Sequence, residues 1–423
     1  MSFNAALSGL NAASAELKVI GNNVSNASTS GFKKSRTEFA DIYAVSNLGV
    51  TSNAIGSGVR LSSVAQQFTQ GNIEFTDNNL DLAVNGRGFF LLDDNGSQVF
   101  SRAGAFRVDR EGYVVNANEQ RLQSFQADAS GNITGALGAL RLDSSDIAPQ
   151  STGAIGLDLN LNANAEIPVG AFNPSDPTTY NSSTSLTVYD SLGNSMLSTM
   201  YYVRTAPNSW SAYTYVTPPN GTPVYVQPTG LPANSPAVLT FTDTGALDTV
   251  TPALATNPNA IEFDAVLAAD LATGAADMQF NADYSGSTQY GSNFSVNSLT
   301  QDGFTTGRLS GVDIDDSGIV LARYTNGQSR TLGQLAMADF ANSQGLRQLG
   351  DTNWAETFAS GAALVGAPGT SSLGLIQSGA LEESNVDLTA ELVNMIVAQR
   401  NFQANAEVIS TADAVTQTII NIR

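Results

Sequence analysis

The chain contains neither cysteine nor histidine, and these two absences exclude much of the chemistry that proteins perform. Without cysteine there is no disulfide bond and no thiolate metal site. Without histidine there is no imidazole general base and no imidazole metal ligand. The three lysines, Lys18, Lys33 and Lys34, all lie in the first 34 residues, so the rest of the chain offers no amine nucleophile. The sequence therefore predicts a protein that is not an enzyme and that uses no cofactor or metal.

Long apolar runs and basic segments are also lacking. No apolar run approaches the ~18 residues that span a bilayer, so we expect no membrane insertion. The N-terminus, residues 1–7, lacks the basic region of a cleavable signal peptide, so any export must leave the N-terminus in place. The formal net charge of −20 repels phosphate, so we expect no nucleic-acid partner.

The composition that is present predicts folded domains and a distinct central segment. A chain of 423 residues with 42% hydrophobic residues is typical of two or three domains with real cores. Between Asp146 and Thr300 there are 12 acidic residues and one basic residue, Arg204, a net charge of −11. Strand-like runs at 185–189, 199–203 and 212–216 alternate with turn clusters there. We expect 146–300 to be an inserted, outer β domain.

The segments on either side of the insert also have strand and hairpin signals. The apolar run 89–92 leads into Asp94-Asn95-Gly96, a hairpin turn, and 107–115 resembles a second hairpin. After the insert, apolar runs at 312–314 and 319–321 flank the turn 315–318. We expect 72–145 and 301–380 to form two halves of one discontinuous inner β domain. The pattern at 313–318 also matches half of a calcium loop, but Tyr324 stands where a bidentate glutamate is needed, which favours a hairpin turn.

Apolar residues recur every seven positions at both ends of the chain, a pattern typical of coiled-coil helices. One row is Phe3, Leu10, Leu17 and Val24, with Ala6, Ala13 and Ile20 between; the other is Leu388, Met395, Phe402 and Ile409, with Leu392, Ala406 and Ile420 one turn away. We expect helices of about 28 and 38 residues, the second begun by a capping box at 384–387.

The two helices predict a helical domain of residues 1–30 plus 384–423. Because the nested β domains bring the ends of the chain together, we expect an antiparallel coiled-coil pair. Its faces of small residues would remain for lateral packing with other subunits. The alternative is that both helices pack only on their own domain. The predicted fold class is therefore mainly β with α-helical termini.

The segment 31–71 reads as a spacer between the helical domain and the inner β domain. Its periodicity is weak and is interrupted by glycines, which keep more backbone conformations open than other residues. We predict hinges at Gly31, Gly56 and Gly58, with Gly49 in the same stretch. The alternative is that these glycines are structural turns.

Three separate motifs carry a family resemblance. Residues 22–33 fit the pattern N-N-V-[AS]-N-x-x-T-x-G-[FY]-[KR], residues 80–90 read LDLAVNGRGFF, and residues 384–406 combine Ser-Asn-Val-Asp with a helical run. These motifs, in this order and at these ends, resemble those of the flagellar axial proteins, the family of rod, hook and hook-associated proteins. An insert of about 155 residues within a β domain of about 150 is similar to hook subunits rather than rod subunits.

The resemblance implies a secreted structural subunit that polymerises with copies of itself into a curved hollow tube. Such a tube acts as a universal joint between the rod and the filament of the extracellular flagellum. The implied partners are the distal rod protein, the hook cap protein, the hook-filament junction protein and the flagellar type III export apparatus. The residues expected at the assembly interface are Phe3, Leu10, Leu17, Val24, Asn22, Asn26, Leu388, Leu392, Met395, Phe402 and Ile409. Of these, Asn22 and Asn26 are expected to hydrogen-bond between helices and fix their register.

Three other functions are weighed against this one. A capping or adhesive protein with a ligand-binding outer domain is favoured by the nine of 12 tyrosines that lie between Tyr180 and Tyr290. A two-carboxylate glycosidase has only the abundance of acidic residues in its favour. A rod protein is the nearest alternative within the family.

Overall fold

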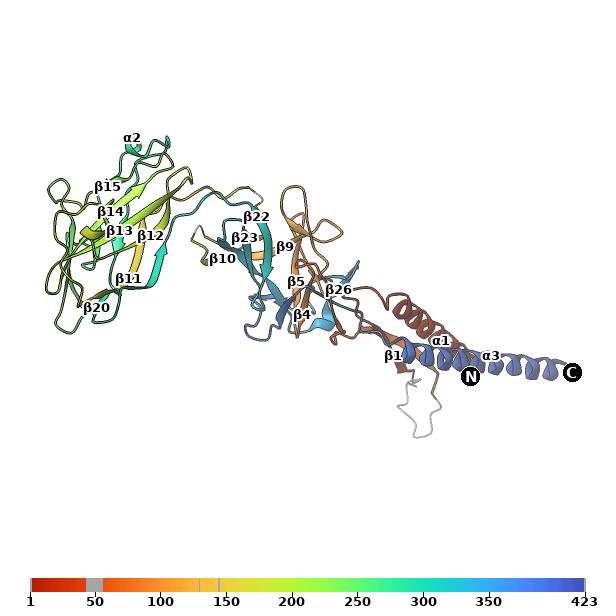
Figure 1. The fold of residues 1–423 in the computed structure, drawn as a ribbon. Coiled ribbons are helices and arrows are strands. Elements are labelled where there is room, and N and C mark those ends of the chain that lie inside the picture. The colour runs from red at the N-terminus through yellow and green to blue at the C-terminus, as the bar shows by residue number, and fades with distance from the viewer. Residues whose placement is uncertain (1, 43–55, 129, 144, 422–423) are drawn as a thin grey trace. The chain divides into compact units, whose positions relative to one another are not determined.

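The protein is described by a computed structural model that covers residues 2–42, 56–128, 130–143 and 145–421 (Figure 1). Its contacts divide the chain into two compact units. The terminal unit comprises Met1–Ser144, Ser310–Arg323 and Ser329–Arg423, and the insert unit comprises Ser145–Leu309 and Tyr324–Gln328. The fold is mainly β with helical termini, as predicted.

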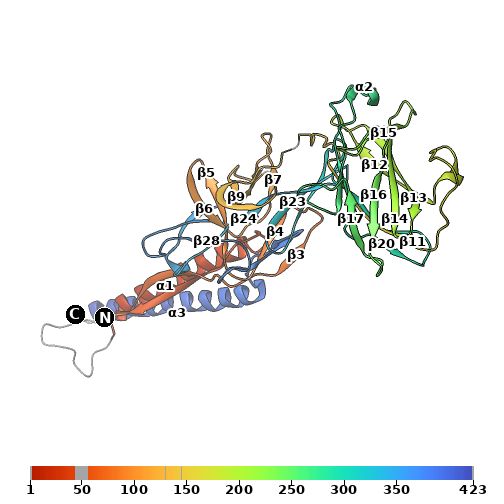
Figure 2. The ribbon, with the colours of Figure 1, turned by 90° about the vertical axis from the view of Figure 1, so that its left-hand side faces the viewer.

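Two long helices form the ends of the chain, α1 (Ser2–Ser25) and α3 (Leu388–Asn421). They lie side by side in both views of the ribbon (Figure 2). The pair is antiparallel, because Gly9 faces Asn405 while Asn23 contacts Glu391. The predicted helical pair is therefore confirmed, with helices of 24 and 34 residues.

The predicted capping box at the start of α3 is wrong by three residues. The capping residue is Asp387, whose carboxylate Oδ1 accepts hydrogen bonds from the backbone N–H groups of Thr389 and Ala390 at 2.9 and 3.1 Å. Ser384 and Asn385 precede the helix in an extended segment. Their side chains bond to backbone outside α3, so they are not available as helix caps.

The segment expected as a spacer contains a two-stranded antiparallel sheet, β1 (Ser35–Asp41) and β2 (Val59–Gln66). Its burial pattern explains why the sequence did not predict it. Most side chains of β2 are exposed, so the strand lacks the alternation of apolar and polar residues that marks a half-buried strand. Gly49, one glycine of this stretch, lies outside the described residues.

The β domain of the terminal unit is built around a large sheet with the central order β22-β23-β24-β9-β5-β6-β27-β26. Its strands come from both sides of the insert, so this β domain is discontinuous. The elements before the insert are β3 (Ile73–Phe75), β4 (Leu82–Asn85), β5 (Phe89–Asp94), β6 (Ser97–Ser101), β7 (Arg107–Val108), β8 (Val114–Val115), β9 (Arg121–Ala127) and β10 (Ile133–Ala139). Those after it are β22 (Leu309–Ile314), β23 (Ile319–Tyr324), β24 (Ser329–Leu335), β25 (Met337–Asp339), the 3-10 turn η2 (Ser343–Gly345), β26 (Arg347–Gly350), β27 (Asn353–Ala355), β28 (Leu364–Gly366), β29 (Leu375–Ser378) and β30 (Ala380–Glu382).

Two short sheets join the chain before the insert to the chain after it. Strand β3 pairs with β30, and β4 pairs with β29, both antiparallel. An aromatic core lies beneath the large sheet, where Phe89, Phe340 and Trp354 meet edge to face or tilted at centroid distances of 5.6–6.0 Å. Burying rings of this size supplies a large part of the stability of a domain.

The hairpins predicted on either side of the insert are confirmed. Strands β5 and β6 are joined by Asn95 and Gly96, both with positive φ, as a tight hairpin turn requires. The segment 315–318 is a hairpin turn between β22 and β23. There the Asp315 carboxylate accepts hydrogen bonds from Ser317 Oγ at 2.7 Å and from the Ile319 N–H at 2.9 Å.

The insert unit holds one core between two sheets, with orders β18-β19-β11-β20 and β12-β13-β14-β16-β17. The core includes Trp210, and Tyr202 and Tyr284, whose hydroxyl oxygens are 3.4 Å apart. The elements are β11 (Ala154–Asn162), η1 (Pro177–Thr179), β12 (Ser182–Tyr189), β13 (Ser195–Ala206), β14 (Ser209–Thr217), β15 (Val224–Val226), β16 (Ala237–Phe241), β17 (Leu247–Thr251), β18 (Ala260–Glu262), α2 (Ala268–Leu271), β19 (Asn281–Asp283), β20 (Thr288–Tyr290) and β21 (Ser295–Gln301). The three strands predicted from the runs at 185–189, 199–203 and 212–216 lie within β12, β13 and β14.

Many tyrosines of the insert unit pack on one another on the outer face of its larger sheet. Phe172 stacks on Tyr213 at 3.9 Å, and Tyr215 contacts Tyr201 and Tyr225 at 6.0 and 5.3 Å between ring centroids. Burial raises the pKa of Tyr225 above its ordinary value. The tyrosine enrichment is therefore explained in large part by packing within the unit.

No helix among the described residues is both long enough and apolar enough to cross a membrane.

Candidate assembly interface

The seam between α1 and α3 is built mainly from small side chains. Ala6 and Ala13 of α1 are 4% exposed, and Ala398 of α3 is fully buried. A Cβ atom placed on Gly9 would lie 2.5 Å from the Asn405 side-chain oxygen, which shows how closely the helix backbones approach. Small residues permit this approach because they leave no bulky side chain between the two helices.

The residues of the predicted apolar rows differ in exposure. Of these residues, Met395, Phe402 and Ile409 are half-buried, whereas Phe3, Leu388 and Leu392 are 43%, 48% and 50% exposed. Leu10, Leu17 and Val24 are half-buried. The intervening row of the predicted pattern, Ala6, Ala13 and Ile20, is buried, whereas the large residues expected at the assembly interface are half-buried or exposed.

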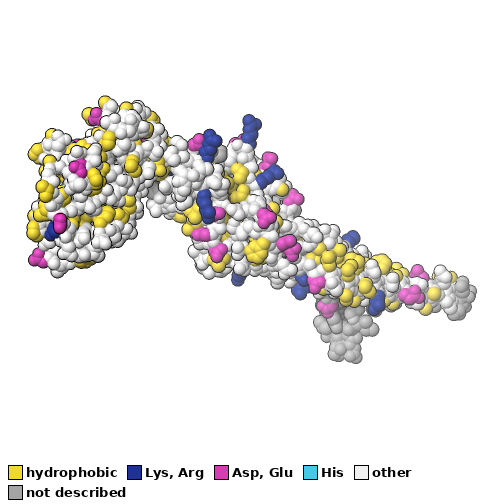
Figure 3. Space-filling view, viewed as in Figure 1, with side chains coloured by type: hydrophobic (Ala, Val, Ile, Leu, Met, Phe, Trp, Pro, Cys, Tyr) yellow, Lys and Arg dark blue, Asp and Glu magenta, His cyan; other side chains and the backbone are white. Residues whose placement is uncertain are grey.

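The exposed apolar side chains of α3 form two adjacent rows. Leu388, Leu392 and Ile396 are spaced four residues apart, as are Val393 and Val397, and each of the five is 48–56% exposed. Figure 3 shows hydrophobic side chains gathered over the helical part of the terminal unit. We call these five residues the apolar face of α3. A contiguous exposed apolar surface of this kind marks an interaction site in a soluble protein.

Among the described residues, neither of the two asparagines predicted to link helices bonds to α3. The side-chain amide of Asn26 donates to the backbone carbonyl of Asn22 at 2.9 Å, one turn earlier in α1. The residue that reaches α3 is Asn23, which is 1% exposed and donates to the Glu391 carboxylate at 3.4 Å. Asn23 also bonds both backbone groups of Ser35, at 2.8 and 2.9 Å, and so fixes α1 against β1 as well as α3.

A buried cluster of three charged side chains joins distant parts of the terminal unit. Lys33 Nζ lies 2.6 Å from Glu382 Oε1, and Arg102 NH1 lies 3.1 Å from Glu382 Oε2. The Glu382 carboxylate also accepts the Gly71 N–H at 2.9 Å, and Lys33 donates to the Thr69 carbonyl at 2.9 Å. The cluster thus connects the end of the N-terminal motif, the return from β2, the end of β6 and strand β30.

The charges of this cluster are held away from water. The side chains of Lys33 and Glu382 are fully buried, and burial lowers the pKa of Lys33 below its ordinary value while the Glu382 carboxylate partly offsets this. Burial likewise lowers the pKa of Arg102. Buried charges persist only when they are paired, so Glu382 is the residue on which both cations depend.

A second link between distant segments lies three residues beyond β30, at Asn385. The side-chain oxygen of Asn385 accepts the Lys34 N–H at 2.8 Å, and its amide nitrogen donates to the Gln67 and Thr69 carbonyls at 2.7 and 3.0 Å. Asn385 therefore binds the N-terminal motif and the return from β2 at once. These contacts explain why Lys33 and Asn385, which belong to the motifs at the two ends of the chain, are needed by the fold.

The hinge candidates have different environments. Gly31 has φ +71°, donates its N–H to the Glu382 carbonyl at 2.7 Å, and lies against the backbone of Arg102 and Ala103. Gly58 has φ +107° and packs on Ser8 of α1. For Gly56, by contrast, none of the described residues would lie within 4 Å of an added Cβ. The geometry of Gly31 and Gly58 favours the alternative of structural turns, and the hinge role stays a prediction.

Sequence reasoning missed Asn23, Glu391 and the whole charged cluster. The signal for Asn23 was its place beside the buried Ile20, three residues earlier on the same helix face. A signal for the cluster was that Lys33 ends the motif at residues 22–33, but nothing in the sequence pairs it with a residue 349 positions away.

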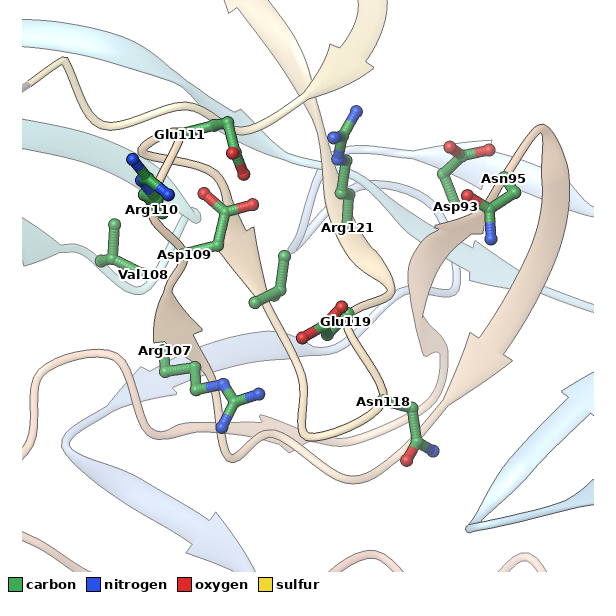
Figure 4. Close-up of a pocket in the computed structure, with 11 residues that line it drawn as sticks. Asp93, Asn95, Arg107, Val108, Asp109, Arg110, Glu111, Asn118, Glu119 and Arg121 are labelled. Atoms are coloured by element: carbon green, nitrogen blue, oxygen red, sulfur yellow. The ribbon is translucent and has the colours of Figure 1, made fainter.

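A wide pocket of about 670 Å³ lies on the β domain of the terminal unit, at the β5–β6, β7–β8 and β8–β9 turns (Figure 4). It is lined by Arg107, Arg110 and Arg121 together with acidic side chains such as Asp109 and Glu119. Most of these charged groups are exposed, and Arg121 lies over the Tyr113 ring at 4.1 Å. Among the described residues no acidic group assembles into a metal-ligating cluster.

The two glycines of α1 differ in a way that gives a testable prediction. We expect Gly21→Ala to raise the free energy of unfolding by about 0.5–1 kcal/mol, because alanine favours helix and an added Cβ meets nothing within 4 Å. The matched control is Gly9→Ala, which we expect to destabilise because its Cβ would press on Asn405. Thermal unfolding of the monomer measures both. Equal shifts for the two variants would contradict the described seam.

Comparison with known proteins agrees with these features. Residues 83–165 match the family described as "Flagellar hook protein FlgE/F/G D1 domain", and 160–304 match "Flagellar basal body protein FlaE D2 domain". Residues 3–33 match "Flagella basal body rod protein", and 377–422 match "Flagellar basal body rod FlgEFG protein C-terminal". The crystal structure of Helicobacter pylori flagellar hook protein FlgE2 covers 73% of this chain and 100% of its own, with a TM-score of 0.53 and 14% identity, which shows a shared fold.

Relatives are similar over the full length. "Flagellar hook protein FlgE" of Escherichia coli K12 is 38% identical, and that of Salmonella typhimurium LT2 is 37% identical, each over 100% of both chains. The protein of the same name from Borreliella burgdorferi is 32% identical over 99% of this chain and 98% of its own. These are structural proteins rather than enzymes. By its sequence, its domains and its fold, the chain belongs to the flagellar hook protein family.

Proposed function

We propose that this chain polymerises into the curved hollow tube of the flagellar hook and acts there as a universal joint between rod and filament. The observation that carries the proposal is the apolar face of α3, which the single chain leaves uncovered. Five aliphatic side chains there are about half exposed, although burying each such side chain contributes about 1.5–3 kcal/mol. Neighbouring copies in a tube would cover this face.

The other expected partners belong to the same proposal. The subunit would be exported without a cleaved signal peptide by the flagellar type III apparatus and would add to the tube beneath the hook cap protein. At its ends the tube would contact the distal rod protein and the hook-filament junction protein. Family membership and the helical ends support these partners, and the site residues predicted from sequence, Phe3, Leu388 and Leu392 among them, would lie at contacts between copies.

A charge on the apolar face of α3 should stop polymerisation. We expect Ile396→Asp to raise the critical concentration for assembly more than tenfold, because assembly would bury an unpaired carboxylate at a cost of several kcal/mol. Sedimentation and negative-stain imaging under polymerising salt measure the outcome, and circular dichroism checks that α3 remains folded.

The matched control is Leu192→Asp in the insert unit, where the replaced side chain is 56% exposed, close to the 50% of Ile396. This variant should assemble far better than Ile396→Asp. Normal tubes from Ile396→Asp would show that the apolar face of α3 is not an assembly contact.

A further inference from the structure

A groove of about 540 Å³ with mixed polar and apolar lining lies in the terminal unit between the N-terminal motif and the β domain. Its walls come from the end of α1 and the turn that follows, the segment after β6, the β8–β9 turn and the β26–β27 hairpin. We call it the amide groove, because five of its lining residues carry amide side chains: Asn22, Asn26, Asn116, Asn118 and Gln348. Two of the residues predicted at the assembly interface, Asn22 and Asn26, are therefore in this groove rather than in the helix seam.

The groove offers unused hydrogen-bonding capacity with little charge. Within the described part of the chain, the side chains of Asn22, Asn118 and Gln348 make no hydrogen bond, and each can donate and accept. The one ionisable residue in the lining is Asp351. Such a surface is complementary to peptide groups, which also donate and accept without charge.

The β26–β27 hairpin presents a strained residue to this groove. Its turn residues Asp351 and Thr352 have φ +50° and +57°, directly after Gly350 with φ +97°. Turns with two positive φ values favour Asn-Gly or Asp-Gly, and a β-branched residue in this conformation is a genuine outlier. The Thr352 hydroxyl bonds only to the adjacent Asp351 carbonyl at 2.6 Å, a contact that stabilises no other element. The folded single chain would therefore be more stable with glycine at position 352.

We propose that the amide groove is a docking surface for a second copy of this chain and that the Thr352 side chain contacts that copy. This inference rests on the proposed function, because a homopolymer supplies the second copy. Charge favours the same occupant. Two chains with a formal net charge of −20 repel each other over much of their surface, so contact between them needs surfaces with little charge. The Thr352 carbonyl accepts the Ser101 hydroxyl at 3.0 Å, a bond that glycine would keep, so only the strained side chain is without a contact in the fold. Strain retained for such a side chain is typical of a functional contact.

The test is a substitution that should move monomer stability and assembly in opposite directions. We expect Thr352→Gly to raise the melting temperature of the monomer by a few degrees, because glycine adopts positive φ without strain. The same variant should raise the critical concentration for assembly at least threefold. A purely structural turn predicts unchanged or improved assembly, and that result would overturn the inference. A fall of several degrees in melting temperature would also overturn it, since Thr352 would then be needed by the fold.

The matched control is Ser371→Gly, a residue with φ +54° outside the groove, which should leave assembly unchanged. A second variant, Asn118→Ala with Gln348→Ala, should weaken assembly without shifting the melting temperature, and normal assembly of this variant counts against the groove. Failure of the two proposals is distinguishable. If the wild type forms tubes, Ile396→Asp does not, and the groove variants assemble normally, only the groove proposal is overturned. Absence of wild-type tubes overturns both.

Discussion

Glu382→Gln is expected to lower the free energy of unfolding of the terminal unit by about 3–5 kcal/mol, the usual effect of removing one partner from a buried ion pair. The amide keeps the shape of the side chain but leaves Lys33 and Arg102 buried without a counter-charge. Denaturant unfolding measures the loss. The chain has two tryptophans, and Trp354 lies in the terminal unit while Trp210 lies in the insert unit. A Trp210→Phe background therefore makes fluorescence report the affected unit.

The neighbouring residue supplies the control. Glu383 has an exposed side chain, so Glu383→Gln should change the free energy of unfolding by less than about 0.5 kcal/mol. Equal losses from Glu382→Gln and Glu383→Gln would show that the buried cluster does not hold the unit together.

The pH dependence of the Glu382→Gln deficit follows from Lys33. Burial sets the pKa of Lys33 below its ordinary value of 10.5, so the unfolded chain binds more protons than the folded chain as pH approaches 10.5. Without the Glu382 carboxylate this pKa falls further, and a neutral Lys33 no longer needs a counter-charge. The stability difference between wild type and Glu382→Gln should therefore be smaller at pH 10 than at pH 7. A difference that stays constant would mean that Lys33 remains charged in the variant.

The elements that sequence predicted well are those with strong local signals. The β5–β6 hairpin follows from Asn95 and Gly96, and the two terminal helices follow from seven-residue periodicity. The insertion of one β domain into another was visible because proline, tyrosine and acidic residues concentrate in the insert. In each case the deciding information lies within a few dozen residues.

The sequence of one chain did not predict which face of each terminal helix packs against the other helix. Both terminal helices carry more apolar residues than one seam needs, so periodicity alone does not say which row faces the partner helix and which faces outward. The structure buries Ala6, Ala13 and Ala398 and exposes Leu392 and Ile396. The seven-residue pattern included Ala6, Ala13 and Ile20 together with the large residues, and it left open which row faces the partner helix. Close packing of the two backbones favours the small residues, and this leaves large apolar side chains for contacts outside the pair.

Gly31→Ala is expected to lower the free energy of unfolding of the terminal unit by about 2–4 kcal/mol. Alanine in the left-handed conformation costs about 1–2 kcal/mol, and crowding in a packed region adds about 1–3 kcal/mol. The conformation is φ +71°, and an added Cβ would lie 2.5 Å from the Arg102 carbonyl carbon. Rotation away is opposed by the Gly31 N–H, which donates to the Glu382 carbonyl at 2.7 Å.

Gly56→Ala is the matched control for Gly31→Ala, and the Gly31→Ala result separates the turn interpretation from the hinge interpretation. Among the residues that the structure describes, none lies within 4 Å of a Cβ at Gly56, so this substitution should leave the free energy of unfolding unchanged within about 0.5 kcal/mol or raise it slightly. The measurement is paired, with denaturant unfolding of the monomer and swimming speed of cells that carry each variant. If Gly31 is a structural turn, Gly31→Ala loses stability and swimming together. If Gly31 is a hinge, Gly31→Ala keeps its stability and swimming alone declines, because bending requires a backbone freedom that the folded monomer does not use.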